Sequence, residues 1–277
     1  MSDTLQARVR VDAALAAVDG MPDAPAKCSL WASTLTLLSR ATRLSLRNPE
    51  GLTTALVLPV MLMLMFVFLF GGAIHTGTRY VNFVVPGVLL ICVGFGSGLT
   101  AVTVATDLST GVFDRFRAMD VSARGVINGH VVASVVRNVV STILVFAVAL
   151  AIGYRSHADI GAWLVATGVL VLFMLSLAWL AAAIGVLAKS PEAANGVMFM
   201  VAFLPYASSA FVPVSTMPGW LQAFARNQPV TQVVDVVRGE LMGTSLQGQL
   251  GAAVLWSVAI ATVSAALAGV LFARRSG

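Results

Sequence analysis

The chain has 277 residues, of which 58% are hydrophobic and 10% are charged, and its mean hydropathy is +0.90. Soluble domains carry about 25% charged residues, so this composition excludes an ordinary soluble protein and indicates a membrane protein. The net charge of +5 arises from basic residues scattered among hydrophobic blocks, with no basic patch interleaved with aromatic residues. We therefore expect no nucleic-acid partner.

The first 48 residues contain no apolar run long enough to cross a membrane. Residues 1–28 are predicted to form a polar cytoplasmic tail. In residues 29–48, apolar side chains at helical spacing face away from a basic side, which predicts an amphipathic helix lying along the cytoplasmic membrane surface. The alternative is an ordinary solvated helix that orients the first span. The basic residues are Arg40, Arg43 and Arg47.

Residues 49–277 contain six long stretches that are apolar and nearly free of charge. A bilayer core about 30 Å thick requires about 20 apolar helical residues, because backbone groups must pair within the segment. The predicted fold class is therefore an all-α membrane protein with six transmembrane helices. The expected spans are about 52–74, 80–106, 131–153, 160–188, 193–212 and 250–273.

The basic residues between these spans predict the orientation of the chain. With a cytoplasmic N-terminus, twelve Lys and Arg residues fall on the cytoplasmic side and four on the other. Retained basic residues mark the cytoplasmic side, so we expect a multi-pass protein of the cell membrane with both termini in the cytoplasm. Arg137 lies near the start of the third predicted span, and we expect its side chain to reach the cytoplasmic interface.

The stretch 211–249 is too apolar for a free loop and too interrupted by proline for one straight span. It predicts short re-entrant helices that dip partway into the outer leaflet, provided that protein neighbours cover the broken backbone. The alternative is a structured external loop with a tryptophan anchor at the interface. The residues assigned to this external segment are Pro213, Pro218, Trp220, Pro229, Arg238 and Gly243.

The chemistry of an ATPase is missing from the chain. A phosphate-binding loop needs glycines and a Gly-Lys-Ser/Thr end, whereas Lys189-Ser190 follows Ala188. No catalytic triad or metal-ligand spacing is present, so we expect no catalytic, cofactor or metal site. The acidic residues lie in tails, span ends or connections, so an ion-coupled mechanism lacks its usual carrier. Energy then comes from a partner, or the chain is a passive pore or scaffold.

The predicted cytoplasmic connection 106–124 is compact and mixed in charge. Phe113, Phe116 and Met119 follow each other at intervals of three residues, a pattern that suits a short helix docking into the groove of a partner. The alternative is a loop on the membrane surface.

This connection resembles the characteristic cytoplasmic segment of ABC-2 type permeases, especially their daunorubicin-resistance branch. There an acidic residue, a glycine and an Arg-Phe-Arg sequence lead into the third span. The chain departs from the family at Asp120, where many relatives carry proline, and at His130, where they often carry arginine. The resemblance extends from about Arg40 and continues in 190–194, 208–213, 217–221, 227–231 and 238–243.

The resemblance implies a six-span permease with an interfacial helix and paired short helices between spans five and six. It also implies a homodimer or heterodimer of permease chains in the lipid membrane, bound to two copies of an ABC ATP-binding subunit. ATP and Mg would be held by that partner, with none in this chain. The implied ATPase-coupling residues are Asp107, Gly111, Phe113, Asp114, Arg115, Phe116, Arg117 and Arg124.

The expected function is that of the permease subunit of an exporter, which is not itself an enzyme, within a complex that hydrolyses ATP. We expect a hydrophobic or amphipathic cargo, such as a drug or lipid-like molecule, because the spans offer almost no charge to a charged cargo. The alternatives are a polysaccharide or lipid-linked glycan exporter and, in another class, a secondary transporter or channel without an ATPase.

Overall fold

The structure is a computed structural model that describes residues 49–74, 78–112, 123–244 and 247–275, with only the backbone described at 49–56, 123–124, 247 and 273–275. These residues form helices and connections, and no β-strand occurs among them. The elements are α3 (Pro49–Met65), the π-helical turn η1 (Phe66–Phe70), α4 (Tyr80–Ser109), α6 (Ala123–Ala151), α7 (Ile160–Leu187), α8 (Pro191–Ala202), the 3-10 turns η2 (Leu204–Ala207) and η3 (Val214–Thr216), α9 (Gly219–Asn227), α10 (Pro229–Met242) and α11 (Gln247–Arg275).

Four helices in the described part of the chain are long and apolar enough to cross a membrane, namely α4, α6, α7 and α11. They contain 25 to 30 residues each in their apolar parts. At 1.5 Å per residue they exceed the roughly 30 Å of a hydrocarbon core. The apolar helix Val57–Phe70 is shorter than these four, and so is α8, which has 12 residues. The all-helical membrane fold is thus confirmed, and the count of six spans stays a prediction.

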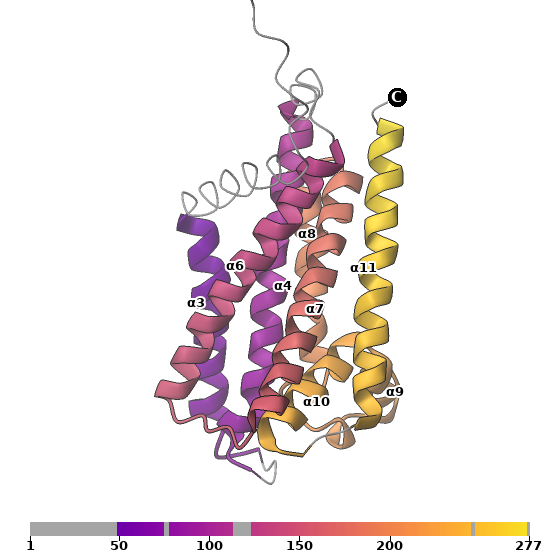
Figure 1. Cartoon of the computed structure of the whole chain (residues 1–277). Helices are drawn as coiled ribbons and strands as arrows, with labels where there is room; N and C mark the ends of the chain where they lie inside the picture. The colour runs from indigo at the N-terminus through magenta and orange to yellow at the C-terminus, as the bar shows by residue number, and fades with distance from the viewer. Residues whose placement is uncertain (1–48, 75–77, 113–122, 245–246, 276–277) are drawn as a thin grey trace, which may run out of the picture.

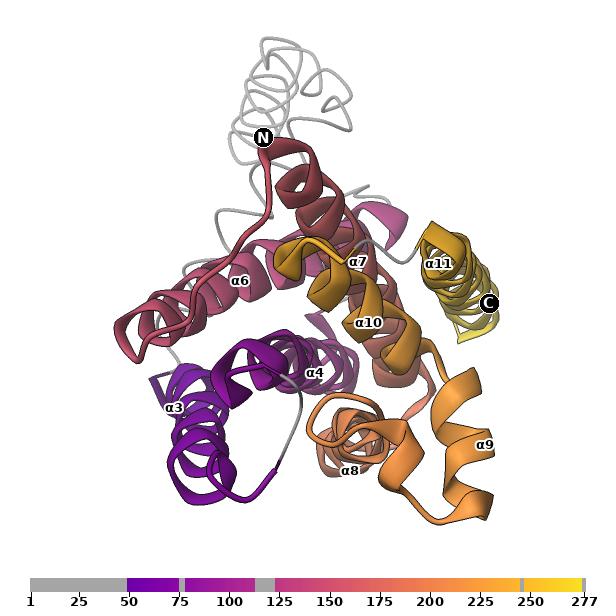
Figure 2. The ribbon, with the colours of Figure 1, turned by 90° about the horizontal axis from the view of Figure 1, so that it is seen from below.

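The long helices run side by side, and α9 and α10 lie together at one end of them (Figure 1). We call that end the lower end, and the opposite end, where α4, α7 and α11 finish, the upper end. Helix α4 packs against α3, α6, α7 and α8 near the middle, whereas α11 packs mainly against α7 (Figure 2). Accordingly 78% of the apolar window of α4 is buried, against 17% for α11.

Local sequence explains where α7 and α8 begin. The Asp159 carboxylate accepts a hydrogen bond of 2.8 Å from the Ala162 amide at the start of α7. The Ser190 hydroxyl accepts one of 3.2 Å from the Ala193 amide at the start of α8, where Pro191 occupies the first helical position. Both side chains satisfy amides that have no partner inside the helix, and proline at that position loses no hydrogen bond.

The segment predicted as the fifth span is not one continuous α-helix. Helix α8 ends at Ala202, because Pro205 has no amide hydrogen to donate to the Val201 carbonyl one turn earlier. The chain continues as the 3-10 turn η2 and leaves helical geometry by Ser208. The second half of the predicted span 193–212 therefore does not continue α8 as an α-helix.

Two glycines allow α4 to approach its neighbours closely. A Cβ atom on Gly87 would lie 2.5 Å from the Ala210 Cβ, and a Cβ atom on Gly185 of α7 would lie 2.7 Å from the Ala101 carbonyl oxygen of α4. Small residues at such contacts let backbones pack within van der Waals distance, which is the main source of helix association in lipid.

Candidate functional site

The Arg238 side chain on α10 joins three separate parts of the chain at the lower end. Its Nε donates to the Phe83 carbonyl of α4 at 3.0 Å, and one Nη donates to the Ser209 carbonyl at 2.7 Å. The other Nη contacts the Asp235 carboxylate at 3.0 Å. The guanidinium carbon also lies 3.8 Å from the centre of the Phe83 ring, within cation–π distance. The planar fork of arginine suits this arrangement of several acceptors.

Asp235 completes this cluster, because its carboxylate also accepts a hydrogen bond of 2.6 Å from the Ser209 hydroxyl. Burial raises the pKa of the Asp235 carboxyl, while the Ser209 hydroxyl and the Arg238 charge oppose that rise. Burial lowers the pKa of Arg238 to about 10, so its guanidinium stays protonated at neutral pH. We call Phe83, Ser209, Asp235 and Arg238 the lower-end clamp.

Further hydrogen bonds connect the start of α4 with Phe211 and with the connection 152–157, and connect 152–157 with the end of α10. The Tyr80 hydroxyl donates to the Phe211 carbonyl at 3.0 Å. The Asn82 carboxamide oxygen accepts from the Arg155 amide at 3.1 Å, and the Ser156 hydroxyl donates to the Leu241 carbonyl at 2.7 Å. The lower end of the bundle is therefore held together by directional contacts between segments far apart in the sequence.

The sequence-predicted external residues mark the boundaries of the short helices. Pro213 precedes η3, Pro218 precedes α9 and Pro229 is the first residue of α10. Gly243 ends α10 with a φ of 72°, and the Thr244 amide donates back to the Gly239 carbonyl at 2.8 Å. This is a glycine-dependent helix ending. Trp220 is 77% exposed. The short helices exist as expected, and their depth in a membrane stays a prediction.

Polar side chains also join α4 to α6 between the middle and the upper end of the bundle. Asp107 contacts His130 at 3.1 Å, and Arg137 donates to the Thr100 hydroxyl at 2.7 Å and to the Gly96 carbonyl at 3.2 Å. The Asn138 amide donates to the Ser97 hydroxyl at 3.0 Å. We call these contacts the α4–α6 ladder; its members are Gly96, Ser97, Thr100, Asp107, His130, Arg137 and Asn138.

The expectation that Arg137 reaches the interface was wrong. Helix α6 begins at Ala123 rather than at about 131, so Arg137 lies about 21 Å along its axis, near the middle. Arginine at the centre of a membrane helix costs about 2.5–3.5 kcal/mol on insertion scales. Hydrogen bonds from a charged donor contribute about 1.5–3 kcal/mol each, so the contacts to Thr100 and Gly96 offset a cost of this size.

The ladder leaves no room for a side chain at Gly96. A Cβ atom there would overlap the Asn138 carboxamide oxygen. Asn138 and Ser97 have no exposed surface, and Thr100 is 2% exposed. The two helices are thus interlocked by shape as well as by hydrogen bonds.

Of the predicted coupling residues, the structure describes three. Asp107 belongs to the α4–α6 ladder, and Gly111 follows the end of α4 with a φ of 69° that favours glycine. Arg124 lies in the first turn of α6, where only the backbone is described. The remaining coupling residues Phe113, Asp114, Arg115, Phe116 and Arg117, and the interfacial residues Arg40, Arg43 and Arg47, lie outside the described residues.

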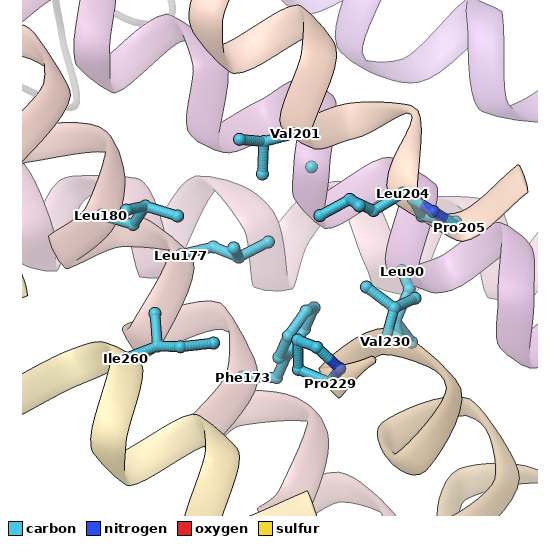
Figure 3. Close-up of a pocket in the computed structure, with 11 residues that line it drawn as sticks. Leu90, Phe173, Leu177, Leu180, Val201, Leu204, Pro205, Pro229, Val230 and Ile260 are labelled. Atoms are coloured by element: carbon cyan, nitrogen blue, oxygen red, sulfur yellow. The ribbon is translucent and has the colours of Figure 1, made fainter. Parts of the chain in front are cut away.

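An apolar cavity of about 80 Å³ lies beside the break between α8 and η2 (Figure 3). Its wall comes from α4, α7, α8, η2, α10 and α11. Sites for drug-sized ligands usually measure about 300–1,000 Å³, so this cavity accommodates only a small apolar group. The lining residues are Leu90, Gly94, Phe173, Leu177, Leu180, Val201, Leu204, Pro205, Pro229, Val230 and Ile260.

Sequence reasoning missed most members of the clamp and the ladder. Asp235 lies three residues before Arg238, a spacing that places the two on one helical face, and this signal was available. Asn138 follows Arg137 inside an apolar stretch, which also indicates an interior polar face. No sequence pattern links Ser209 to Asp235, or Ser97 to Asn138, because tertiary packing brings them together.

The family model described as ABC-2 type transporter matches residues 32–242. The daunorubicin resistance ABC transporter permease protein DrrB1 of Streptomyces coeruleorubidus is 31% identical over 266 residues, covering 95% of this chain and 94% of that protein. The probable doxorubicin resistance ABC transporter permease protein DrrC of Mycobacterium tuberculosis (strain ATCC 25618 / H37Rv) is 23% identical over 224 residues, covering 80% and 81%.

Proposed function

Because the chain belongs to the ABC-2 type transporter family, we propose that it is the membrane-spanning permease subunit of an ATP-driven exporter. The observation that carries the proposal is the match, along 95% of the chain, to a protein named as a daunorubicin resistance ABC transporter permease. ATP and Mg would be bound by two copies of a separate ABC ATP-binding subunit. A second permease chain, identical or related, would complete the transmembrane part.

The proposed arrangement in the membrane has six spans. Helices α4, α6, α7 and α11 supply four of them. Helix α3 with η1 and helix α8 with η2 supply the other two, of which the second is broken at Pro205. The count of twelve basic residues on one predicted side of the membrane against four on the other supports a cytoplasmic position for the last turns of α4 and α7, with α9 and α10 dipping into the outer leaflet at the opposite, lower end.

In the proposed mechanism, ATP draws the two partner subunits together, and the segment from Asp107 to Arg124 carries that motion into the bundle. The segment connects α4 to α6, so a force on it acts on both helices. The bundle then changes from an inward-facing to an outward-facing arrangement or opens a lateral path. The cargo needs no covalent chemistry.

We propose a hydrophobic or amphipathic cargo. The printed names of the relatives refer to resistance to daunorubicin and doxorubicin, and the cavity in this chain is apolar on every side. Because the cavity measures only about 80 Å³, a drug-sized cargo requires either a rearranged bundle or a site shared by two chains. A glycan cargo would need hydrogen-bonding side chains, which the lining of this cavity lacks.

Reconstitution in liposomes tests the proposal. The chain and its ATP-binding subunit are expected to transport daunorubicin with ATP, whereas neither subunit alone transports it and the purified chain alone hydrolyses no ATP. Lipid-linked glycans serve as the competing cargo in the same vesicles. Stimulation of ATP hydrolysis by glycans alone would overturn the proposed cargo, and ATP-independent transport by the chain alone would overturn the proposed function.

A further inference from the structure

The α4–α6 ladder resists sliding between its two helices. Its contacts extend along α4 from Gly96 to Asp107, which corresponds to about 16 Å of helix axis. Every contact is a hydrogen bond or ion pair with a defined geometry, and Gly96 is interlocked with Asn138. A shift of one residue would break all of these contacts together, because each residue advances 1.5 Å and turns about 100° around the axis.

Helix α4 meets α7 and α8 through a different kind of surface. Its small apolar residues Ala101 and Ala105 pack against Ala181 and Met198, and Val104 packs against Ala182. Such contacts have no preferred direction, so shifts of 1–2 Å between packed helices cost much less than the loss of a buried hydrogen bond. Gly185 of α7 also packs closely against Ala101 and Val104, but these contacts are apolar and can re-form after a small shift, whereas a shift of α4 against α6 breaks hydrogen bonds.

The lower end of α4 is fixed by other contacts. Arg238 binds the Phe83 carbonyl, Tyr80 binds the Phe211 carbonyl, and Asn82 accepts from Arg155. A helix that is held at its lower end and can shift against its neighbours farther up moves by tilting about the fixed end. The largest displacement then occurs at the upper end, where α4 ends and α6 begins.

We infer that α4 and α6 move as one rigid unit that pivots about the lower end, and that Arg137 is the positioning residue that holds the unit together. The inference rests on the proposed function, since it concerns how motion of the ATP-binding partner enters the membrane. The cavity lies at the boundary of this unit: Leu90 and Gly94 belong to α4, while Phe173 and Leu177 belong to α7. Pivoting therefore changes the shape of the cavity.

Distances between spin labels test the motion in the assembled complex. Cys28 and Cys92 are first replaced by alanine, and label pairs are placed at exposed positions. Labels at Ser109 and Asn128 measure the distance between α4 and α6 within the unit. Labels at Asn128 and Leu187 measure the distance between α6 and α7 at the upper end. Labels at Leu150 and Leu164 measure the distance between the same two helices at the lower end.

ATP with vanadate is expected to change the Asn128 to Leu187 distance by at least about 2 Å and to leave the other two distances unchanged. An equally large change in the distance between the labels at Ser109 and Asn128 would show that α4 and α6 do not move as one rigid unit. Three unchanged distances in a complex that transports would overturn the pivot.

Variants of Arg137 test the positioning role without depending on the partner. In the isolated chain in lipid nanodiscs, we expect one narrow Ser109 to Asn128 distance peak for the wild type and for Val136→Ala, a control whose side chain is 40% exposed on the same helix. Arg137→Met is expected to lose that single peak, and Arg137→Lys is expected to recover it in part. An unchanged peak in Arg137→Met would overturn the role of Arg137 even if the complex proves inactive.

In the complex, Arg137→Met is expected to lower cargo moved per ATP hydrolysed by at least about fivefold, the low end of ordinary coupling between sites. Arg137→Lys should lower it less, because a lysine ammonium can still donate to the Thr100 hydroxyl. Loss of ATP hydrolysis and transport in equal proportion would instead indicate a general structural defect and would overturn the inference. Absence of transport by the wild-type complex would count against the proposed function alone.

Discussion

At the scale of single residues, the lower-end clamp shows how one arginine organises a polar cluster. Arg238 occupies its donors with carbonyls from two other segments and with the Asp235 carboxylate. Phe83 lies in the first turn of α4, and both its carbonyl oxygen and its ring contact the Arg238 guanidinium. The local sequence of α4 and the charge on α10 thus complement each other.

We predict that Arg238→Ala destabilises the chain by about 3–5 kcal/mol, because it leaves the Asp235 carboxylate partly buried without its cation. The measurement is the thermal unfolding midpoint of the purified chain in detergent. Arg226→Ala is the matched control, since Arg226 is exposed on α9 and its side chain donates to the Gln222 side chain; this variant should cost less than about 1 kcal/mol. Equal losses for the two variants would contradict the clamp.

At the scale of elements, the pairing of α4 with α6 depends on Gly96, although its ordinary helical backbone would accept any residue except proline. Gly96 is in the interior of α4, where an alanine would favour the helix by about 0.5–1 kcal/mol. Close approach of the Asn138 side chain explains why alanine does not fit.

We predict that Gly96→Ala costs about 1–3 kcal/mol through overpacking against Asn138. Gly98→Ala is the matched control on the same helix, because a Cβ atom there would meet the Met198 Cβ at 3.7 Å, an ordinary contact. Thermal unfolding of the two variants should therefore shift in opposite directions or differ clearly in size. A Gly96→Ala variant as stable as Gly98→Ala would show that α4 and α6 are less tightly packed.

The connection between α4 and α6 gives a second prediction at this scale. Arg115→Ala with Arg117→Ala should leave membrane insertion intact and lower transport strongly, because the two arginines lie in the predicted docking segment. Exposed charge pairs contribute only about 0.2–1 kcal/mol, so a strong effect requires desolvated contact with the partner. The measurement is a transport assay, and the double variant Arg274→Ala with Arg275→Ala is the control for the loss of two basic residues elsewhere in the chain. Normal export would favour the membrane-surface loop.

At the scale of the whole molecule, the four long apolar helices and the distribution of basic residues bear on orientation. The helices alone do not distinguish one face of a membrane from the other, because each is apolar along its length. The basic residues do so, since they resist transfer across the membrane during insertion.

We predict that reporters at Ser190 and Gly277 respond as cytoplasmic sites and a reporter at Gly77 responds as an external site. Impermeant thiol labelling of single-cysteine variants in intact cells provides the measurement, and permeabilised cells provide the control for accessibility. External labelling at Gly277 would contradict the predicted cytoplasmic C-terminus.

Much of the fold was predictable because long apolar helices are properties of local sequence. The first residue of α10 at Pro229 and its last turn at Gly243 follow from proline and glycine chemistry. Helix α6 begins at Ala123, before the predicted span start at about 131, because a helix can continue beyond the apolar stretch through residues such as Arg124 and His130; the bounds of the span stay a prediction. The bend after α8 was not expected within an uncharged stretch, although Pro205 was its physical cause.

The sequence by itself determined the class of the protein, its helical composition and the family to which it is related, because hydrophobicity and motif order are carried by residues near each other in the chain. Only the tertiary structure decided that Arg137 faces Thr100 and Gly96, and that Arg238 joins Phe83 to Ser209. These partners lie 29 to 155 positions apart in the sequence. A hydrogen bond depends on position and direction within a few tenths of an ångström, and packing of the helices sets both.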